Sequence, residues 1–242
     1  MRRILITNDD GIYSDGIIRL ARCALEFGEV WVVAPDSERS AASHSITLRT
    51  HIDLFPYGFP VSGVHAYSCS GMPADCVRVG SLALMPDKPD VVLSGINYGY
   101  NMASDIQYSA TVGAALEGAF QGFHSIALSE AAVPCHEVTD AFLKGILEKW
   151  IDRKLPWDQI VNINFPGCPL SECKGTLEGL KTARRGFFRD RYKEILKLPG
   201  EGVRMMVTGD SNEDAEEGTD FRALVDNYVS VSILCNIRGL SI

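Results

Sequence analysis

Residues 4–17, ILITNDDGIYSDGI, indicate which kind of fold this chain forms. The apolar run Ile4–Ile6 predicts a buried strand, and Asp9, Asp10 and Gly11 soon after it predict a turn. A turn needs only one Asp, however, and two adjacent carboxylates repel each other unless water or a cation offsets the repulsion. The stretch is therefore either a solvated turn or half of a metal site.

Strand and helix patterns alternate from this stretch onward. A helix is expected from about Ser14 to Phe27, where apolar residues recur at helical spacing, and the apolar run 30–34 suits a strand covered on both faces. Further strands are predicted at 46–52, 91–93, 125–128 and 160–165, and further helices at 73–84, 109–121 and 139–151. This alternation predicts the α/β class, with a doubly wound and mainly parallel sheet.

The character of the chain changes near residue 180. Residues 182–197 are basic and aromatic, the stretch 198–202 is a turn signal, and 203–207 reads as a returning strand. We therefore expect one domain over 1–242, with an α/β core at 1–179, a projecting hairpin arm at 180–208, and an acidic loop and last strand at 209–242. The arm could stack on bases or, as we favour, contact another subunit through Arg184, Arg185, Phe187, Phe188, Arg189, Arg191 and Tyr192.

Composition narrows the classes of partner. A net charge of −8 argues against a general nucleic-acid surface. Seven cysteines without a C-x-x-C pattern are typical of reduced thiols, and no apolar run approaches the length that spans a membrane. We expect a cytoplasmic protein that binds neither nucleic-acid polymers nor membranes.

Three loops are expected at one edge of the sheet, because ligands of parallel sheets bind at the carboxyl ends of the strands. There Asp9 and Asp10 would offer hard oxygen ligands for Mg²⁺ or Mn²⁺. The loop around Asn97 would add neutral oxygens, and residues 37–45 would bring hydroxyls and a cation unless they form an ordinary surface loop. The helix start at 109–111 suits phosphate, although an ordinary Ser or Thr cap explains it equally well.

Several familiar signatures are absent from the sequence. No G-x-G-x-x-G follows the first strand, and there is no G-x-x-x-x-G-K-[ST], G-x-S-x-G or H-E-x-x-H. The residues thus give little support to a dinucleotide, P-loop, serine-hydrolase or zinc-protease function.

Five segments together resemble the SurE-type nucleotidases, the stationary-phase survival protein family. They are ILITNDDGIYSDGI at 4–17, VVAPDSERSAASHSIT at 32–47, SGMPADCVRVG at 70–80, PDVVLSGINYGYNMASDIQYSATVGAALEGA at 89–119, and TDFRALVDNYVSVSI at 219–233. The resemblance implies a Rossmann-like sheet with an extended C-terminal arm, and a homodimer or homotetramer. It also implies a divalent-metal-dependent phosphatase that hydrolyses nucleoside 5′-monophosphates, and in some cases 3′-monophosphates, to nucleoside and phosphate.

The family's functional residues are carried over by motif. The resemblance places one Mg²⁺ or Mn²⁺ on Asp9, Asp10, Ser40 and Asn97, with Asp9, Asp10 and Asn97 as the catalytic residues. It places phosphate on Ser109, Ala110 and Thr111 beside Asn97, and we expect Ser43 and His44 to complete the substrate site.

The sequence departs from the family at two points. Ala110 stands where the family usually has Gly, which is harmless if its φ is negative and unfavourable if its φ is positive. Only nine residues follow Ile233, so the family's C-terminal helix and its subunit contacts stay in question.

Two other functions remain open on the sequence. A phosphoryl-accepting receiver domain also begins with an acidic pair, but it needs an Asp at the end of a later strand, where Asp90 instead begins one. A nucleotide-binding module without catalysis would use the same loops.

Overall fold

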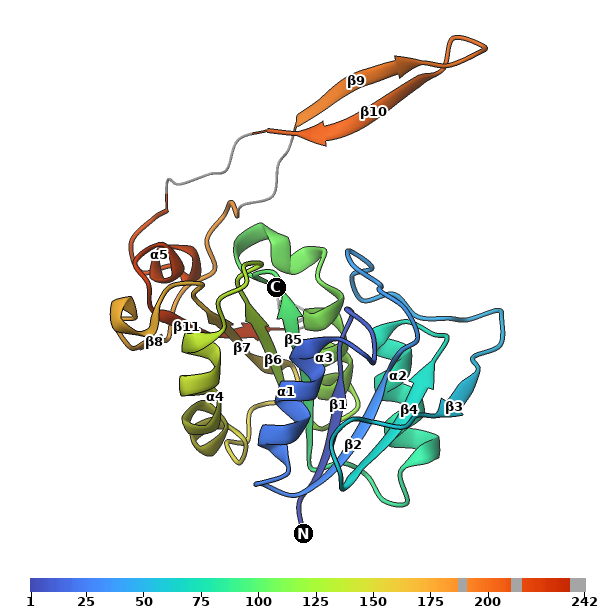
Figure 1. Cartoon of the computed structure of the whole chain (residues 1–242), viewed down its shortest axis with the longest axis vertical. Coiled ribbons are helices and arrows are strands. Elements are labelled where there is room, and N and C mark those ends of the chain that lie inside the picture. Colours follow the sequence, from blue (N-terminus) through green and yellow to red (C-terminus); the bar gives the residue numbers. More distant parts are fainter. Residues whose placement is uncertain (187–190, 210–214, 236–242) are drawn as a thin grey trace, which may run out of the picture.

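A computed structural model describes residues 1–186, 191–209 and 215–235 of the chain (Figure 1). Its main sheet has nine strands in the order β3-β4-β2-β1-β5-β6-β7-β11-β8 among these residues. The strands are β1 (Arg3–Thr7), β2 (Glu29–Pro35), β3 (Leu54–Pro56), β4 (Val64–Cys69), β5 (Val91–Tyr98), β6 (His124–Glu130), β7 (Gln159–Phe165), β8 (Thr176–Glu178) and β11 (Val229–Cys235).

The sheet is parallel through its centre. β4, β2, β1, β5, β6 and β7 run in one direction, while β3 pairs with β4 and β11 with β7 in antiparallel fashion. Chain order reverses at β1, which lies between β2 and β5, so the sheet is doubly wound. The predicted fold class is confirmed.

Helices cover both faces of the sheet. α1 (Asp15–Ala24) and α4 (Glu137–Trp150) lie on one face, and α2 (Pro73–Val79) and α3 (Ala110–Phe120) pack on the other (Figure 1). The shorter helical segments are η1 (Gly80–Leu84), η2 (Ala103–Gln107), η3 (Leu170–Glu172) and α5 (Asp220–Val225).

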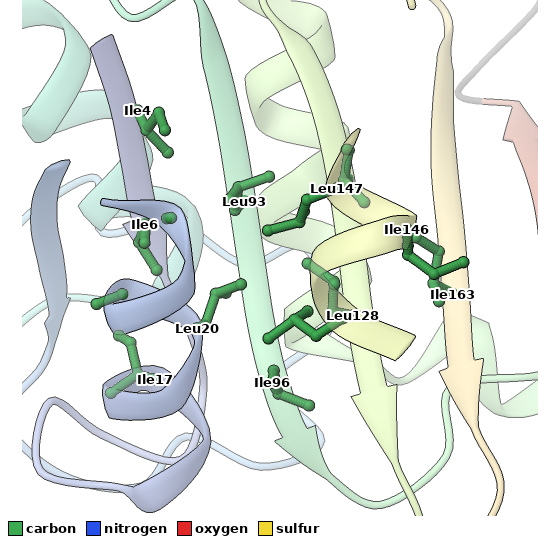
Figure 2. Packing of buried hydrophobic residues seen from close by; sticks show 14 of the residues in the cluster. Ile4, Ile6, Ile17, Leu20, Leu93, Ile96, Leu128, Ile146, Leu147 and Ile163 are labelled. Carbon is green, nitrogen blue, oxygen red and sulfur yellow. The ribbon is translucent and has the colours of Figure 1, made fainter. Parts of the chain in front are cut away.

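The core follows from the alternation of side chains along the buried strands. Figure 2 shows Ile4 and Ile6 of β1 and Leu93 of β5 with Leu20 of α1 on one face of the sheet. Leu5 points to the opposite face, where it belongs to the apolar cluster of α2 and α3. Each fully buried side chain of this size contributes roughly 1.5–3 kcal/mol of transfer free energy. Packing on both faces therefore stabilises the sheet, and with it the position of the loops at the carboxyl ends of its strands.

Small residues bring α3 close to the sheet. A Cβ added at Gly118 would lie 2.5 Å from Ser125 Oγ and 3.0 Å from Val92 Cβ, so nothing larger than glycine fits there without movement. Ala114 is fully buried on the same helix. Close packing of α3 fixes where its first turn meets the loop after β1.

Two predicted strand limits were wrong. Residues 46–52 form no strand; the backbone N–H of Thr47 donates to the Asp75 carboxylate instead, and Leu48 is 81% exposed. The edge strands β3 and β4 form further along the chain, between residues 54 and 69. β5 continues five residues past its predicted limit at Leu93, to Tyr98.

The predicted hairpin arm is present. β9 (Arg191–Lys197) and β10 (Val203–Thr208) pair antiparallel and project away from the sheet (Figure 1). Phe187, Phe188 and Arg189 lie outside the described residues, as do 210–214 of the acidic loop. The domain limits at 179 and 208 stay predictions.

All seven cysteines are free, and three of them, Cys69, Cys76 and Cys168, are buried. In the described ranges, every helix is too short or too polar to cross a membrane. The cytoplasmic location stays a prediction.

Candidate active site at the carboxyl edge of the sheet

Asp9 connects three parts of the molecule. It follows β1 at the carboxyl edge, and its side chain is buried, with only 4% of the residue exposed. One carboxylate oxygen, Oδ1, accepts a hydrogen bond from the hydroxyl of Thr111 in the first turn of α3. Its backbone carbonyl accepts from the N–H of Arg39 at 2.7 Å. The loop after β1, the start of α3 and the loop after β2 therefore meet at Asp9.

Burial makes the charge of Asp9 costly. Its pKa is raised to about 7, chiefly because burial removes the carboxylate from water; the hydrogen bond from Thr111 opposes this rise, and the negative charge of Asp10 adds to it. Among the described residues, no Lys, Arg or His forms an ion pair with Asp9 or Asp10. The pair therefore has no cationic side chain as partner in that part of the chain.

Asp10 contacts the irregular end of β5. Its Oδ2 accepts from the backbone N–H of Tyr98 at 3.0 Å. Burial raises its pKa, and the nearby charges of Glu38 and Glu130 raise it further, although the bond from Tyr98 opposes them. β5 shifts register against β6 between Ser94 and Asn97, just before the residue that contacts Asp10.

Asn97 is oriented by the backbone that directly follows β5. Its Nδ2 donates to the carbonyl of Gly99 at 2.8 Å, and the N–H of Gly99 donates to the Glu130 carbonyl at 2.9 Å. Gly99 has φ of +141°, a region that favours glycine. With Nδ2 engaged as a donor, the Oδ1 atom is the part of this amide suited to a cation.

Ser40 is not joined to the aspartates by a hydrogen bond. Its hydroxyl donates to Glu38 Oε1 at 2.6 Å, on the exposed side of the loop. Its neighbour Arg39 makes the contact to Asp9 through the backbone. The role of Ser40 as a metal ligand stays a prediction.

The start of α3 has the predicted cap. Ser109 Oγ accepts from the N–H of Val112 at 3.0 Å, and the helix begins at Ala110. Ala110 is fully buried and does not have positive φ. The Cβ of Ala110 therefore causes no backbone strain, so alanine is compatible with the backbone at the position where the family usually has glycine.

Ser43 and His44 lie beside α3 in a cavity of about 400 Å³ that Ser109 also lines. Ser43 Oγ donates to the Gln107 carbonyl at 2.7 Å. Gly113 permits the contact, because a Cβ there would lie 2.7 Å from the Ser43 carbonyl oxygen. The structure thus groups three predicted substrate-binding residues, while Asp10 lines a different cavity of about 260 Å³.

Glu117 is a buried residue that the sequence analysis missed. Its carboxylate contacts His44 Nε2 at 2.8 Å, Arg78 Nη1 at 2.9 Å and Gln121 Nε2 at 2.7 Å. Burial alone would raise its pKa, but these partners outweigh burial and lower the pKa to about 2. The sequence does contain an indication of this role, because Glu117 is the only charged residue in the small, apolar helix ATVGAALEGAF. A charged residue on such a helix is rarely buried without partners.

The donor set fits a hard divalent cation. Carboxylates of Asp9 and Asp10 and the amide oxygen of Asn97 are the ligand types that Mg²⁺ and Mn²⁺ prefer. No group of three or more His, Cys, Asp or Glu suited to a metal occurs in the described part of the chain. A cation at this edge would therefore need neutral oxygens as well as the two carboxylates.

Fold and site define a class: doubly wound α/β proteins with two adjacent carboxylates at the sheet edge, one of them buried against the N-terminus of a helix. Residues 4–189 match the family described as "Survival protein SurE". The chain belongs to the SurE family.

Named relatives are similar over most of their length. The chain is 38% identical to the 5′-nucleotidase SurE of Thermosipho africanus over 231 residues, which covers 95% of this chain and 89% of that protein. Identity to the 5′-nucleotidase SurE of Clostridium botulinum strain Loch Maree is 39% over 237 residues, covering 96% and 92%. The crystal structure of the SurE protein from Aquifex aeolicus superposes with a TM-score of 0.81 at 33% identity, covering 96% of this chain and 93% of that one.

Proposed function

We propose that this chain hydrolyses nucleoside 5′-monophosphates, and also 3′-monophosphates, to nucleoside and inorganic phosphate with the help of a divalent cation. Membership of the SurE family supports a nucleotidase activity. The observation that carries the proposal for this chain is the buried Asp9 carboxylate, which has no cationic partner in the described residues and touches Thr111 at the start of α3.

The proposed roles follow from chemistry and position. Asp9, Asp10, Asn97 and Ser40 would hold one Mg²⁺ or Mn²⁺, which when bound polarises a phosphoryl oxygen and lowers the pKa of a water. The free N–H groups at 109–111 would hold the phosphate, because a helix N-terminus favours anions. With its carboxylate engaged in ligation, Asp9 is less suited to act as a covalent nucleophile. Two groups are candidates for the general acid that protonates the leaving nucleoside: His44 and a water held by the cation.

A phosphate-release panel tests the proposal. Nucleoside 5′- and 3′-monophosphates are incubated with wild-type protein and Mg²⁺ or Mn²⁺, with excess chelator, and with Asp9→Asn. Release only by wild type with metal is expected. Equal release under all three conditions would overturn the metal mechanism; nucleotide returned intact would favour a binding module, and acid-labile phosphate kept on the protein a receiver.

We also propose that the arm joins subunits in a homodimer or homotetramer. Tyr192 on β9 is 68% exposed, and Met205 and Met206 on β10 are about half exposed. A free arm would leave this apolar surface in water. Light scattering of wild type and of Met206→Asp measures the assembly. The variant should lower the oligomeric state, and a wild-type monomer would overturn the proposal.

A further inference from the structure

The loop at 99–108 connects two parts of the proposed site. It begins shortly after Asn97, a proposed cation ligand, and ends at Ser109, where α3 and the proposed phosphate site begin. The loop also contacts a residue of the substrate cavity, because the carbonyl of Gln107 accepts from Ser43 Oγ at 2.7 Å. The position of this loop therefore affects both the cation ligands and the substrate-binding residues.

Asp220 holds the middle of this loop from the C-terminal part of the chain. It is the first residue of α5 and is fully buried. Its Oδ2 accepts from the backbone N–H of Ala103 at 2.9 Å, and its Oδ1 accepts from the N–H groups of Ala183 and Phe221, both at 2.8 Å. Burial raises the pKa of Asp220, and these three bonds oppose the rise. The carboxylate thus joins the loop to α5 and to the segment that leads into the arm.

The backbone of Ala103 explains why the loop needs a partner at this point. Its φ is +50°, in the left-handed region that favours glycine, and the residue is 2% exposed. A residue other than glycine keeps this conformation only where its surroundings hold it there. The bond from its N–H to Asp220 supplies that constraint at the residue where η2 begins.

A second set of bonds holds the loop earlier along the chain, at Asn101. The N–H of Asn101 donates to Asn164 Oδ1 at 2.8 Å, and its carbonyl accepts from Asn162 Nδ2 at 2.8 Å. These bonds fix the part of the loop that precedes Ala103, whereas Asp220 fixes the start of η2. We propose that Asp220 is a positioning residue for the reaction: through η2 it keeps the substrate-binding residues aligned with the cation ligands. The inference rests on the proposed function for its reaction.

Asp220→Asn should release the loop selectively. The amide has the shape of the carboxylate but only one acceptor oxygen. If that oxygen keeps the two bonds to Ala183 and Phe221, the amide nitrogen faces the N–H of Ala103, so that a donor opposes a donor. The matched control is Asp226→Asn at the end of the same helix, because Asp226 is partly exposed and pairs with Arg222 at 2.7 Å.

Hydrogen–deuterium exchange of the metal-free protein measures the hold on the loop. Loss of one hydrogen bond to a charged group predicts that the amides of 99–108 exchange roughly tenfold to a hundredfold faster in Asp220→Asn than in the wild type. Asp226→Asn should exchange like the wild type in this loop. Equal exchange of the loop in Asp220→Asn and wild type would overturn the inference.

Steady-state phosphate release from AMP separates positioning from stability. It is measured at a temperature at which melting curves show all three proteins folded, so a loss of stability alone leaves kcat unchanged. Because a misplacement of about 1 Å can cost a factor of about 10², we expect kcat of Asp220→Asn to fall by roughly tenfold to a hundredfold, with a smaller change in KM. Asp226→Asn should keep both constants. If the loop of Asp220→Asn exchanges faster but its kcat equals that of the wild type, Asp220 has no positioning role.

Exchange in the wild type tests the same contact if Asp220→Asn does not fold. Residues 58–63 lie in the loop between β3 and β4 and provide the reference for weakly protected amides. At residue resolution, the N–H of Ala103 should exchange about a hundredfold more slowly than theirs, and equal rates would show that Asp220 does not hold the loop. A wild type that releases no phosphate would instead reject the nucleotidase proposal, while exchange would still decide whether Asp220 fixes this loop.

Discussion

Asp9 and Glu117 are two buried carboxylates whose environments differ sharply: Asp9 accepts from Thr111 in the first turn of α3, whereas Glu117 lies in the second half of that helix. Asp9 is 4% exposed and Glu117 is 5% exposed. Glu117 receives three side-chain partners, one of them an arginine, and its pKa falls to about 2. Asp9 receives one side-chain hydroxyl beside another aspartate, and its pKa rises to about 7.

The two carboxylates differ in whether the chain itself supplies the donors and cations that offset a buried negative charge. Around Glu117 the protein supplies the compensating donors, as expected for a carboxylate that holds elements together. Around Asp9 the described residues supply too few, and a carboxylate perturbed in this way is a candidate for function. The comparison favours a structural role for Glu117 and supports the proposal that Asp9 binds a cation.

Removal of the Asp9 charge should have the largest effect. Asp9→Asn keeps the shape of the side chain but removes a charged ligand, and metal-assisted catalysis contributes several kcal/mol. We expect kcat/KM for a nucleoside monophosphate to fall by about 10³-fold, which corresponds to about 4 kcal/mol. Steady-state phosphate release measures it. If Glu117→Gln were the variant with this loss and Asp9→Asn were active, the assignment of the two carboxylates would be reversed.

Neutralising Glu117 should affect stability, and in a pH-dependent way. Its pKa is about 2 in the folded protein against 4.5 for the free side chain, so its contribution is present above pH 4.5 and is lost as the pH falls toward 2. The shift corresponds to about 3 kcal/mol. In urea unfolding at pH 7, Glu117→Gln should lower the free energy of unfolding by about 3 kcal/mol. Between pH 4.5 and 2, the free energy of unfolding of the variant should change less with pH than that of the wild type.

Glu148, exposed on α4, provides the control for charge removal. Glu148→Gln should change the free energy of unfolding by less than about 0.5 kcal/mol, as is usual for surface substitutions. Equal losses for the two variants would mean that the partners of Glu117 contribute no stability.

Divalent cation should stabilise the wild type through Asp9. A cation present at a hundred times its dissociation constant adds about 2.7 kcal/mol to the free energy of unfolding. Thermal melts with increasing Mg²⁺ or Mn²⁺ should therefore shift upward for wild type and hardly at all for Asp9→Asn. If the cation raised the melting temperature of Asp9→Asn but not that of Glu117→Gln, the cation would bind through Glu117 and the proposed role of Asp9 would be wrong.

Replacement of Ala110 should have the smallest effect. Glycine gains nothing where φ is already negative, and it loses helix propensity and a buried methyl group. We expect Ala110→Gly to destabilise the protein by about 1 kcal/mol in urea, without a gain in kcat/KM. A large gain in activity would show that the alanine Cβ obstructs the phosphate.

Much of the fold could be predicted because its pattern is local. Buried runs such as Val91–Leu93 and the helical spacing near Ser14 identify elements without tertiary information. The prediction failed at 46–52, where the sequence looks strand-like but the backbone of Thr47 bonds to the Asp75 side chain rather than to a neighbouring strand. Edge segments are decided by such competition, which a periodic pattern does not record.

The sequence by itself determined the alternation of the central strands and helices, and hence that the loops carrying Asp9 and Asp10, Asn97 and the start of α3 leave one edge of the sheet. Only the tertiary structure decided which carboxylates have partners. The contacts that do so join residues far apart in the chain: Asp9 with Thr111, and Glu117 with His44. Packing of α3 on the sheet creates these contacts, and burial gives them their energetic weight, because an acid removed from water depends on the few groups that remain beside it.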